Sequence, residues 1–243
     1  MALDDCVLEG VKEYVLDGQV ADVAIVAARS DGELALFAAG VSTARCTPHP
    51  TLDLTRRQAR LEFTGSPAVR VSPVGDRGAA AARALDLARV ALAVESVGVG
   101  AASLAMTVEY LKIREQFGVP LATFQALRHR VADLAVRLEA ATSSAWYALR
   151  VAGTEEFAVA APLAKLVATQ AAWQITAQSI QLHGGIGFTW EHDAQLYFKR
   201  AVASRFLFGD PASLRRCVGA RAGLWPATVA GPGQSGAGLA APE

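Results

Sequence analysis

The stretch Gln181-Leu-His-Gly-Gly-Ile-Gly-Phe188 decides the fold, together with a distant companion at Arg114-Glu-Gln-Phe-Gly118 that is followed by Phe124-Gln125. Each segment lies where a long apolar helix is expected to end or to begin. Both combine polar side chains with glycines, which allow a ligand to approach the backbone closely. This combination indicates a ligand-binding surface made from helix ends.

The residues around these two motifs, from Gly78 to about Ala222, have a helical pattern. Ala79 to Ile113 predicts one long helix that ends before Gly118-Val-Pro120, and Thr123 is the expected N-cap of the next helix. Further helices are expected at about 155–182, at about 192–206 and after Asp210-Pro211, where proline suits a first helical position. Four or five antiparallel helices with short connections form a bundle.

The first part of the chain, to about residue 74, has a strand pattern instead. A hairpin is expected from Ala24–Ala28 and Leu34–Phe37, with Ser30-Asp-Gly32 as its turn. Other strands are expected at 11–16, 52–54 and 59–63, and Pro67 and Pro73 mark the boundary. The fold class is therefore α+β, with a partial antiparallel β domain at 1–74 and a four-helix-type bundle at 75–224. The Gly/Pro-rich end, 225–243, is expected to be a disordered tail.

Composition excludes several classes of function. Of 243 residues, 52% are hydrophobic and 19% charged, and 23 basic residues balance 23 acidic ones, so no basic surplus indicates a nucleic-acid partner. The three cysteines and four histidines show no metal-ligand spacing, so no metal site is expected. No signal peptide and no uninterrupted apolar span are visible, which predicts a cytoplasmic protein outside the membrane.

The two opening motifs resemble those of the acyl-CoA dehydrogenase family, whose members bind FAD with these segments across a subunit interface. The resemblance implies a partial middle β domain followed by the C-terminal helical domain, without the N-terminal helical domain. Arg114 offers the fork of donors that suits pyrophosphate oxygens. By resemblance, the residues expected to contact FAD in the two motifs are Arg114, Phe117, Gln125, Gln181, Gly184 and Gly185.

A third segment has a looser resemblance to the family. Lys12-Glu-Tyr-Val-Leu-Asp-Gly18 is similar to a Lys-x-Trp-Ile-Thr-Asn-Gly segment whose aromatic residue packs on the flavin ring. Tyr14 is expected either at the flavin or as an ordinary strand aromatic. Leu16 stands where the family has a hydroxyl that reaches flavin N5, and leucine donates no hydrogen bond.

The carboxylate that should remove the α-proton of the acyl-CoA substrate is not found at its expected positions. Relatives carry this glutamate in one of two places, and the present chain has Phe208 in one and Ala88 in the other. Asp86 and Arg89 match the family pattern around the second place and are expected at the substrate. Glu95 is a weak candidate for the base because it lies about 10 Å farther along the helix. The remaining sources are Asp210, whose expected role is a helix N-cap, or a partner subunit.

The leading interpretation is a supporting subunit that completes a partner's FAD site in an acyl-CoA dehydrogenase. It would work in a homo- or hetero-oligomer, such as a dimer of dimers, with electron-transfer flavoprotein as a possible acceptor. One alternative is a flavin oxidase or monooxygenase on the same fold. Others are a flavin-free helical interaction protein and a truncated copy.

Overall fold

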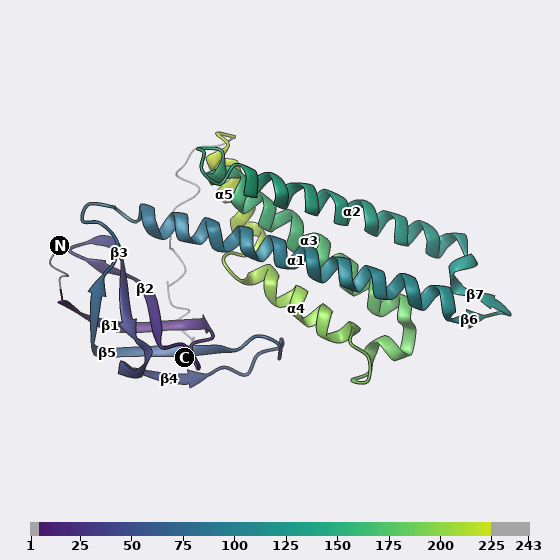
Figure 1. Ribbon diagram of the computed structural model, residues 1–243, viewed down its shortest axis with the longest axis horizontal. Helices are drawn as coiled ribbons and strands as arrows, with labels where there is room; N and C mark the ends of the chain where they lie inside the picture. The colour runs from purple at the N-terminus through teal and green to yellow at the C-terminus, as the bar shows by residue number, and fades with distance from the viewer. Residues whose placement is uncertain (1–4, 225–243) are drawn as a thin grey trace, which may run out of the picture.

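The computed structural model describes residues 5–224, which form a small antiparallel sheet joined to a long helical bundle (Figure 1). Five strands precede the bundle: β1 (Asp5–Leu16), β2 (Val23–Ser30), β3 (Glu33–Gly40), β4 (Ala44–Pro48) and β5 (Gln58–Arg70). The strand order is β1-β5-β3-β2, β4 also pairs with β5, and every pairing is antiparallel. Phe37, Leu61 and Phe63 are buried in the core of this sheet.

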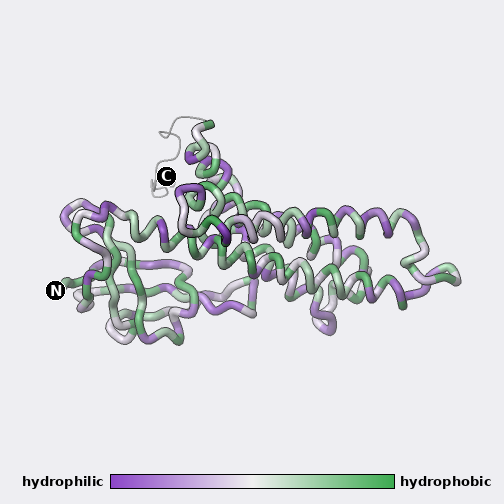
Figure 2. Tube along the Cα trace, turned by 45° about the horizontal axis from the view of Figure 1, so that its top comes forward, coloured by the Kyte–Doolittle hydropathy of each residue, from purple (hydrophilic) through white to green (hydrophobic). Residues whose placement is uncertain are grey.

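Five helices follow: α1 (Ala79–Ile113), α2 (Gln125–Arg150), α3 (Phe157–His183), α4 (Ala194–Phe206) and α5 (Pro211–Arg221). Helices α1, α2 and α3 pack against one another, and α4 packs on α3 and α1. The core between them is made mostly of alanines, such as Ala93, Ala141, Ala161 and Ala164, which allow the helix backbones to approach closely. Figure 2 shows apolar and polar residues interspersed along these helices, with apolar residues predominating in α1 and α3.

The free end of the bundle lies opposite the sheet (Figure 1). There a two-residue hairpin, β6 (Glu115–Gln116) and β7 (Val119–Pro120), joins α1 to α2 through a 3-10 turn, Leu121–Thr123. Another 3-10 segment, Gly184–Phe188, follows α3. We call this end of the molecule the distal end.

The α+β fold class and the long helix at 79–113 are confirmed, as is the hairpin of β2 and β3. Asp210 is the N-cap of α5, since its carboxylate accepts from the backbone N–H groups of Ala212 and Ser213. Three local predictions were wrong. Residues 52–54 form no strand but part of a turn, because the buried carboxylate of Asp53 accepts from Thr55 instead. Pro67 lies inside β5, where it faces Val7.

The third error concerns the start of α2. Its N-cap position is Phe124, and the Thr123 hydroxyl donates to the carbonyl of Pro120. Strand β4 was not predicted, because its exposed residues show no alternation. The expected disordered tail at 225–243 lies outside the described residues. Among the described helices, α1 is long and apolar enough to cross a membrane, which is weak evidence because the core helix of a soluble protein meets the same criterion.

Candidate functional site

The residues of the two opening motifs lie together at the distal end of the bundle (Figure 1). Arg114 is the C-cap of α1, Gln125 is the first residue of α2, and Gln181 belongs to the last turn of α3. All three are exposed. Within residues 5–224 the side chains of Arg114 and Gln181 make no hydrogen bond or ion pair, so their donors are available to a ligand.

The glycines and aromatics of the same motifs are also at the surface. Gly184 and Gly185 are exposed, and Gly184 has a φ of 66°, which favours glycine. Phe117 is 92% exposed at the tip of the β6–β7 hairpin, where its ring contacts the Phe124 ring edge-on. A large aromatic side chain this exposed indicates a surface that another molecule covers.

A buried histidine packs against the backbone of the glycine loop. His183 is 3% exposed and packs between the rings of Tyr110 and His192, with both centroids 4.5 Å away. Burial is the main reason that its pKa lies below the ordinary value, so the ring is neutral at pH 7. A Cβ at Gly187 would come within 2.8 Å of His183 Cβ, so this position requires glycine. His183 therefore packs the loop from the side of the helical core.

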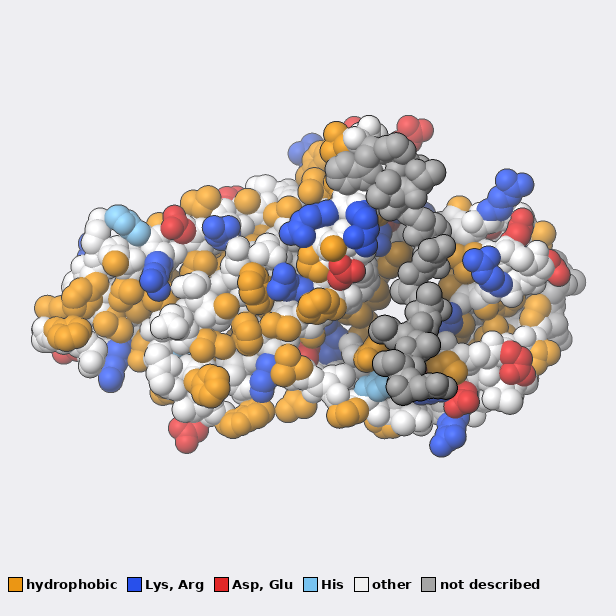
Figure 3. Space-filling view, turned by 180° about the vertical axis from the view of Figure 1, so that it is seen from behind, with side chains coloured by type: hydrophobic (Ala, Val, Ile, Leu, Met, Phe, Trp, Pro, Cys, Tyr) orange, Lys and Arg blue, Asp and Glu red, His pale blue; other side chains and the backbone are white. Residues whose placement is uncertain are grey.

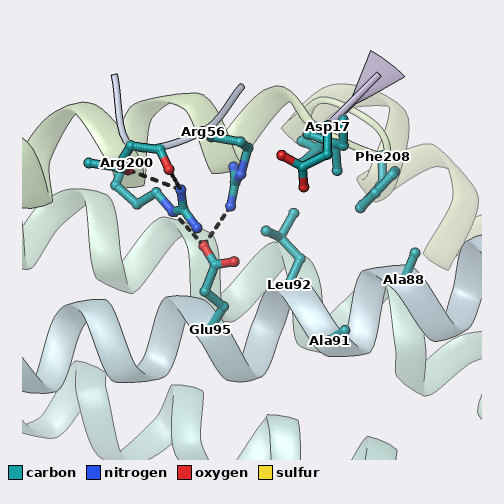
Figure 4. Close-up of a pocket in the computed structure, with 11 residues that line it drawn as sticks. Asp17, Arg56, Ala88, Ala91, Leu92, Glu95, Arg200 and Phe208 are labelled. Atoms are coloured by element: carbon teal, nitrogen blue, oxygen red, sulfur yellow. Dashed lines mark hydrogen bonds and ion pairs between the residues drawn. The ribbon is translucent and has the colours of Figure 1, made fainter. Parts of the chain in front are cut away.

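The second region is a cavity of about 420 Å³ where the sheet meets the bundle (Figure 4). Ala88 and Phe208, the two positions where the family has its base, both line it. They lie at one end of the cavity, whereas Glu95 lies at the other (Figure 4). The two positions thus converge in space although they are far apart in sequence, and neither side chain accepts a proton.

Glu95 lines this cavity but is already paired. Its Oε1 accepts from Arg56 Nη2 at 2.6 Å and from Arg200 Nε at 2.9 Å. Arg200 also donates to Thr55 and lies 3.4 Å from the Asp53 carboxylate. These contacts connect α1 and α4 to the turn between β4 and β5, so Glu95 joins the bundle to the sheet.

Sequence reasoning missed a second acidic residue in the cavity, Asp17. Asp17 follows β1 directly, and its carboxylate points toward Leu92 at the middle of the cavity (Figure 4). Among the described residues it has no hydrogen-bond or ion-pair partner for its side chain. The available signal was the Leu16-Asp17-Gly18 segment, in which Asp17 stands where the family pattern has asparagine.

Two further cavities, of about 730 and 340 Å³, adjoin the first at Leu207 and Phe208. Tyr14 lines both, which is where the resemblance to the flavin-contacting segment places it. Tyr14, Asp17 and Phe208 have φ values of 55°, 52° and 58°, a conformation that non-glycine residues rarely adopt. Such backbone strain costs about 1–3 kcal/mol per residue and collects at ligand sites, which supports a functional role for the cavities.

Asp86 and Arg89 line none of these three cavities. Both are buried, and Asp86 pairs with Arg89 and with Arg221 at 2.8 Å each. Arg89 also donates through Nε to the backbone carbonyl of Phe208 at 3.1 Å. The expected substrate contact of these two residues has no support in the structure, because their side chains are engaged behind the cavity wall.

The two regions lie far apart along one helix. Ala88 and Arg114 are separated by about 26 residues of α1, which corresponds to about 39 Å. That distance exceeds the length of a dinucleotide. One dinucleotide cannot reach both regions of the same chain.

Comparison with known proteins identifies the family. The C-terminal domain of acyl-CoA dehydrogenases matches residues 76–223. The chain belongs to the acyl-CoA dehydrogenase family. The acyl-CoA dehydrogenase IpdE2 of Mycolicibacterium smegmatis is 40% identical over 205 residues, which are 84% of this chain and 60% of that protein.

Solved structures of the family have the same fold. Butyryl-CoA dehydrogenase from Megasphaera elsdenii superimposes with a TM-score of 0.84 at 27% identity, over 91% of this chain and 61% of that one. A chain of the ChsE4-ChsE5 complex from Mycobacterium tuberculosis gives a TM-score of 0.81 at 26% identity, over 90% and 60% of the two chains. The chain thus spans about three fifths of the length of these relatives.

The family depends on FAD, and the distal end fits part of that cofactor. A guanidinium and two amide side chains are exposed there, beside glycines at which the loop backbone is open to a ligand. A Cβ at Gly184 or Gly185 would meet no other atom within 4 Å, so the surface is open above both residues. This donor set suits a pyrophosphate and its flanking groups.

Proposed function

We propose that the chain is a subunit of an FAD-dependent acyl-CoA dehydrogenase that completes the cofactor site of a neighbouring subunit. The observation that carries this proposal is the separation of the distal end from the cavity along α1. Because one cofactor cannot span both, the distal residues act on a cofactor that lies in the cavity of another chain. The exposure of Arg114, Gln125 and Gln181 supports the same conclusion.

The distal residues have distinct tasks in this site. The Arg114 guanidinium would bind pyrophosphate oxygens, and the amides of Gln125 and Gln181 would orient the neighbouring groups. Gly184 and Gly185 leave the backbone accessible, and Phe117 would cover the cofactor from the water side. Bound FAD supplies the acceptor for the hydride that leaves the β-carbon of an acyl-CoA.

The α-proton of the substrate needs a carboxylate that this chain does not offer at Ala88 or Phe208. We therefore propose that the base belongs to the partner and that this subunit has a supporting role. The relative in the ChsE4-ChsE5 complex supports an assembly of two different chains. A cytoplasmic location and electron-transfer flavoprotein as acceptor are proposed on the family's chemistry alone.

Asp17 favours a second candidate function, in which the chain is active by itself. It is the carboxylate in the 420 Å³ cavity that lacks an ion-pair partner among the described residues. An unpaired carboxylate in a cavity can accept a proton from a bound substrate. In this case the chain would bind flavin and substrate in its own cavity, as a dehydrogenase or as an oxidase of the same fold.

Co-purification distinguishes these functions. The chain is purified alone and together with a full-length family member encoded beside it, and FAD per chain is measured by absorbance while mass is measured by light scattering. FAD in the mixed oligomer alone supports the proposed function. FAD in the isolated chain that bleaches with acyl-CoA supports the second candidate, and absence of FAD from both samples contradicts both.

A further inference from the structure

The bundle contains a fully buried lysine that the proposed function does not use. Lys165 on α3 has no exposed surface, although lysine is almost never fully buried without a specific partner. Burying an ammonium group costs several kcal/mol unless hydrogen bonds compensate for the lost water. The hydrogen bonds of the Lys165 ammonium group therefore indicate which part of the fold it stabilises.

Lys165 binds the backbone on both sides of Phe208. Its Nζ donates to the carbonyl of Arg205 at 3.0 Å and to the carbonyl of Gly209. Arg89 donates to the carbonyl of Phe208 itself. One carbonyl group in the last turn of α4 and two just after the helix are thus held by two buried cations, where the end of a helix leaves acceptors without partners.

These contacts hold the segment 207–209 in an unusual conformation. Phe208 has a φ of 58° and Gly209 a φ of 115°, and Asp210 immediately afterwards caps α5. Phe208 lines all three cavities at the junction, and its ring lies at the end of the 420 Å³ cavity opposite Glu95 (Figure 4). A small rotation of this backbone would move the ring out of the common wall of the cavities.

We propose that Lys165 is a positioning residue that, together with Arg89, fixes the Phe208 ring as the common wall of the three cavities. This inference rests on the proposed function only in treating the cavities as the ligand site of the chain. Lys165 touches no ligand and acts through residue 208. The same contacts would position any side chain at 208, including a carboxylate.

The electrostatic surroundings of Lys165 agree with this role. Burial, and then the nearby Arg89, lower its pKa to about 8, whereas Asp210 opposes the shift and Arg205 adds to it. Lys165 is therefore charged at pH 7 but titrates close to that pH. A probe on the Phe208 ring should register this titration if the lysine controls the ring.

The test places 4-fluorophenylalanine at position 208 and, as a control, at Phe157, which is buried at the start of the same helix, about two turns before Lys165. Fluorine NMR spectra are recorded for the full chain, for Lys165→Met and for Lys199→Met, a control in which the lysine lies over the Trp190 ring. No cofactor is needed, so the outcome is independent of FAD binding and of the proposed function.

We expect one sharp resonance from position 208 in the native chain and a broadened or split one in Lys165→Met, while the Phe157 resonance stays unchanged. Lys199→Met should resemble the native chain at both positions. An unchanged resonance at 208 in Lys165→Met, or equal changes at 208 and 157, would overturn the proposal.

A second measurement covers the case in which Lys165→Met fails to fold. In the native chain, the 208 resonance should shift with a midpoint near pH 8, the value to which burial lowers the pKa of Lys165, and the Phe157 resonance should not. A 208 resonance that is constant from pH 7 up to the pH at which the chain unfolds would contradict the proposal.

Discussion

The polar side chains at the distal end of the bundle differ from those at the junction of sheet and bundle in whether they have partners within the chain. At the distal end, Arg114 and Gln181 are exposed and their side chains are unengaged within the described residues. At the junction, Glu95 and Asp86 are each bound by two arginines. Unengaged donors await another molecule, whereas paired charges fix the fold. The difference is consistent with the proposal that the cofactor site of this chain is shared with a neighbour.

Figure 3 adds to this comparison, since apolar side chains cover much of the bundle surface seen from that side. Val136, Trp146, Phe188 and Trp190 are between 63% and 83% exposed. Large exposed apolar side chains are a common feature of surfaces that bind other proteins. The bundle surface thus supports the proposed assembly with other subunits.

The largest expected effect comes from adding a carboxylate at the junction. Phe208→Glu should place a carboxylate where the family has its base, because Arg89 and Lys165 hold the backbone of residue 208 in place. In a flavin-loaded oligomer, the rate of flavin bleaching by acyl-CoA at this chain's cavity should rise by about 10²- to 10⁴-fold. Phe208→Gln is the matched control without a base. Equal rates in both variants would show that position 208 does not reach the substrate.

The next prediction concerns the removal of two exposed donors at the distal end. Arg114→Ala combined with Gln181→Ala removes two donors to the cofactor, and each charged or polar contact contributes about 1–2 kcal/mol. We expect FAD to bind about 10²-fold more weakly to the assembled oligomer, while circular dichroism shows an intact bundle. Arg215→Ala, an exposed arginine on α5, serves as the control. Normal FAD stoichiometry in the double variant would refute the distal assignment.

A third prediction concerns stability at the junction. Lys165 has a pKa of about 8 in the folded chain and 10.5 as its ordinary value, so the unfolded chain binds more protons between pH 8 and pH 10.5. The free energy of unfolding should therefore rise with pH across this window by up to about 3 kcal/mol. Lys165→Met should lack the rise. Urea unfolding of both proteins at several pH values measures it, and parallel curves would exclude a lowered pKa.

The smallest expected effect comes from a substitution that tests whether Glu95 is a base or only an ion-pair partner. Glu95→Gln should leave any dehydrogenase rate within a few-fold, since the side chain holds Arg56 and Arg200 rather than a substrate. Because Glu95 is 35% exposed, the lost ion pairs should lower the free energy of unfolding by only about 1 kcal/mol. A rate loss of 10² or more would instead identify Glu95 as the general base.

The sequence predicted the elements whose pattern is local and missed those that depend on distant contacts. The helix at 79–113 and the β2–β3 hairpin follow from composition and turn residues alone. The turn at 52–54 was wrongly predicted as a strand because the Asp53 carboxylate accepts from Thr55 and also contacts Arg200, which is 147 residues away. The first turn of α2 was misplaced because Thr123 binds a nearby carbonyl rather than the helix.

In the candidate site, too, the residues in local motifs were predicted and those that depend on distant contacts were not. The motifs at Arg114 and Gln181 were visible because each is contiguous. The structure brings Ala88 and Phe208 to one cavity, and their equivalence to the family's base positions stays a prediction. Asp17 and Lys165 were missed. A buried lysine has no signature in a single sequence, since its burial comes from α4 and the segment after it packing onto α3.

Because α1 is uninterrupted, it limits where insertions and deletions can occur in this chain. It begins beside the sheet, passes the cavity at Ala88 and ends at Arg114 without a break. One inserted residue would rotate everything beyond it by about 100° and advance it by about 1.5 Å. The distal donors would then face away from the cofactor of a neighbour even with every contact residue intact. Insertions are therefore tolerable in the loop before α1, whereas the number of residues between Ala88 and Arg114 must stay constant.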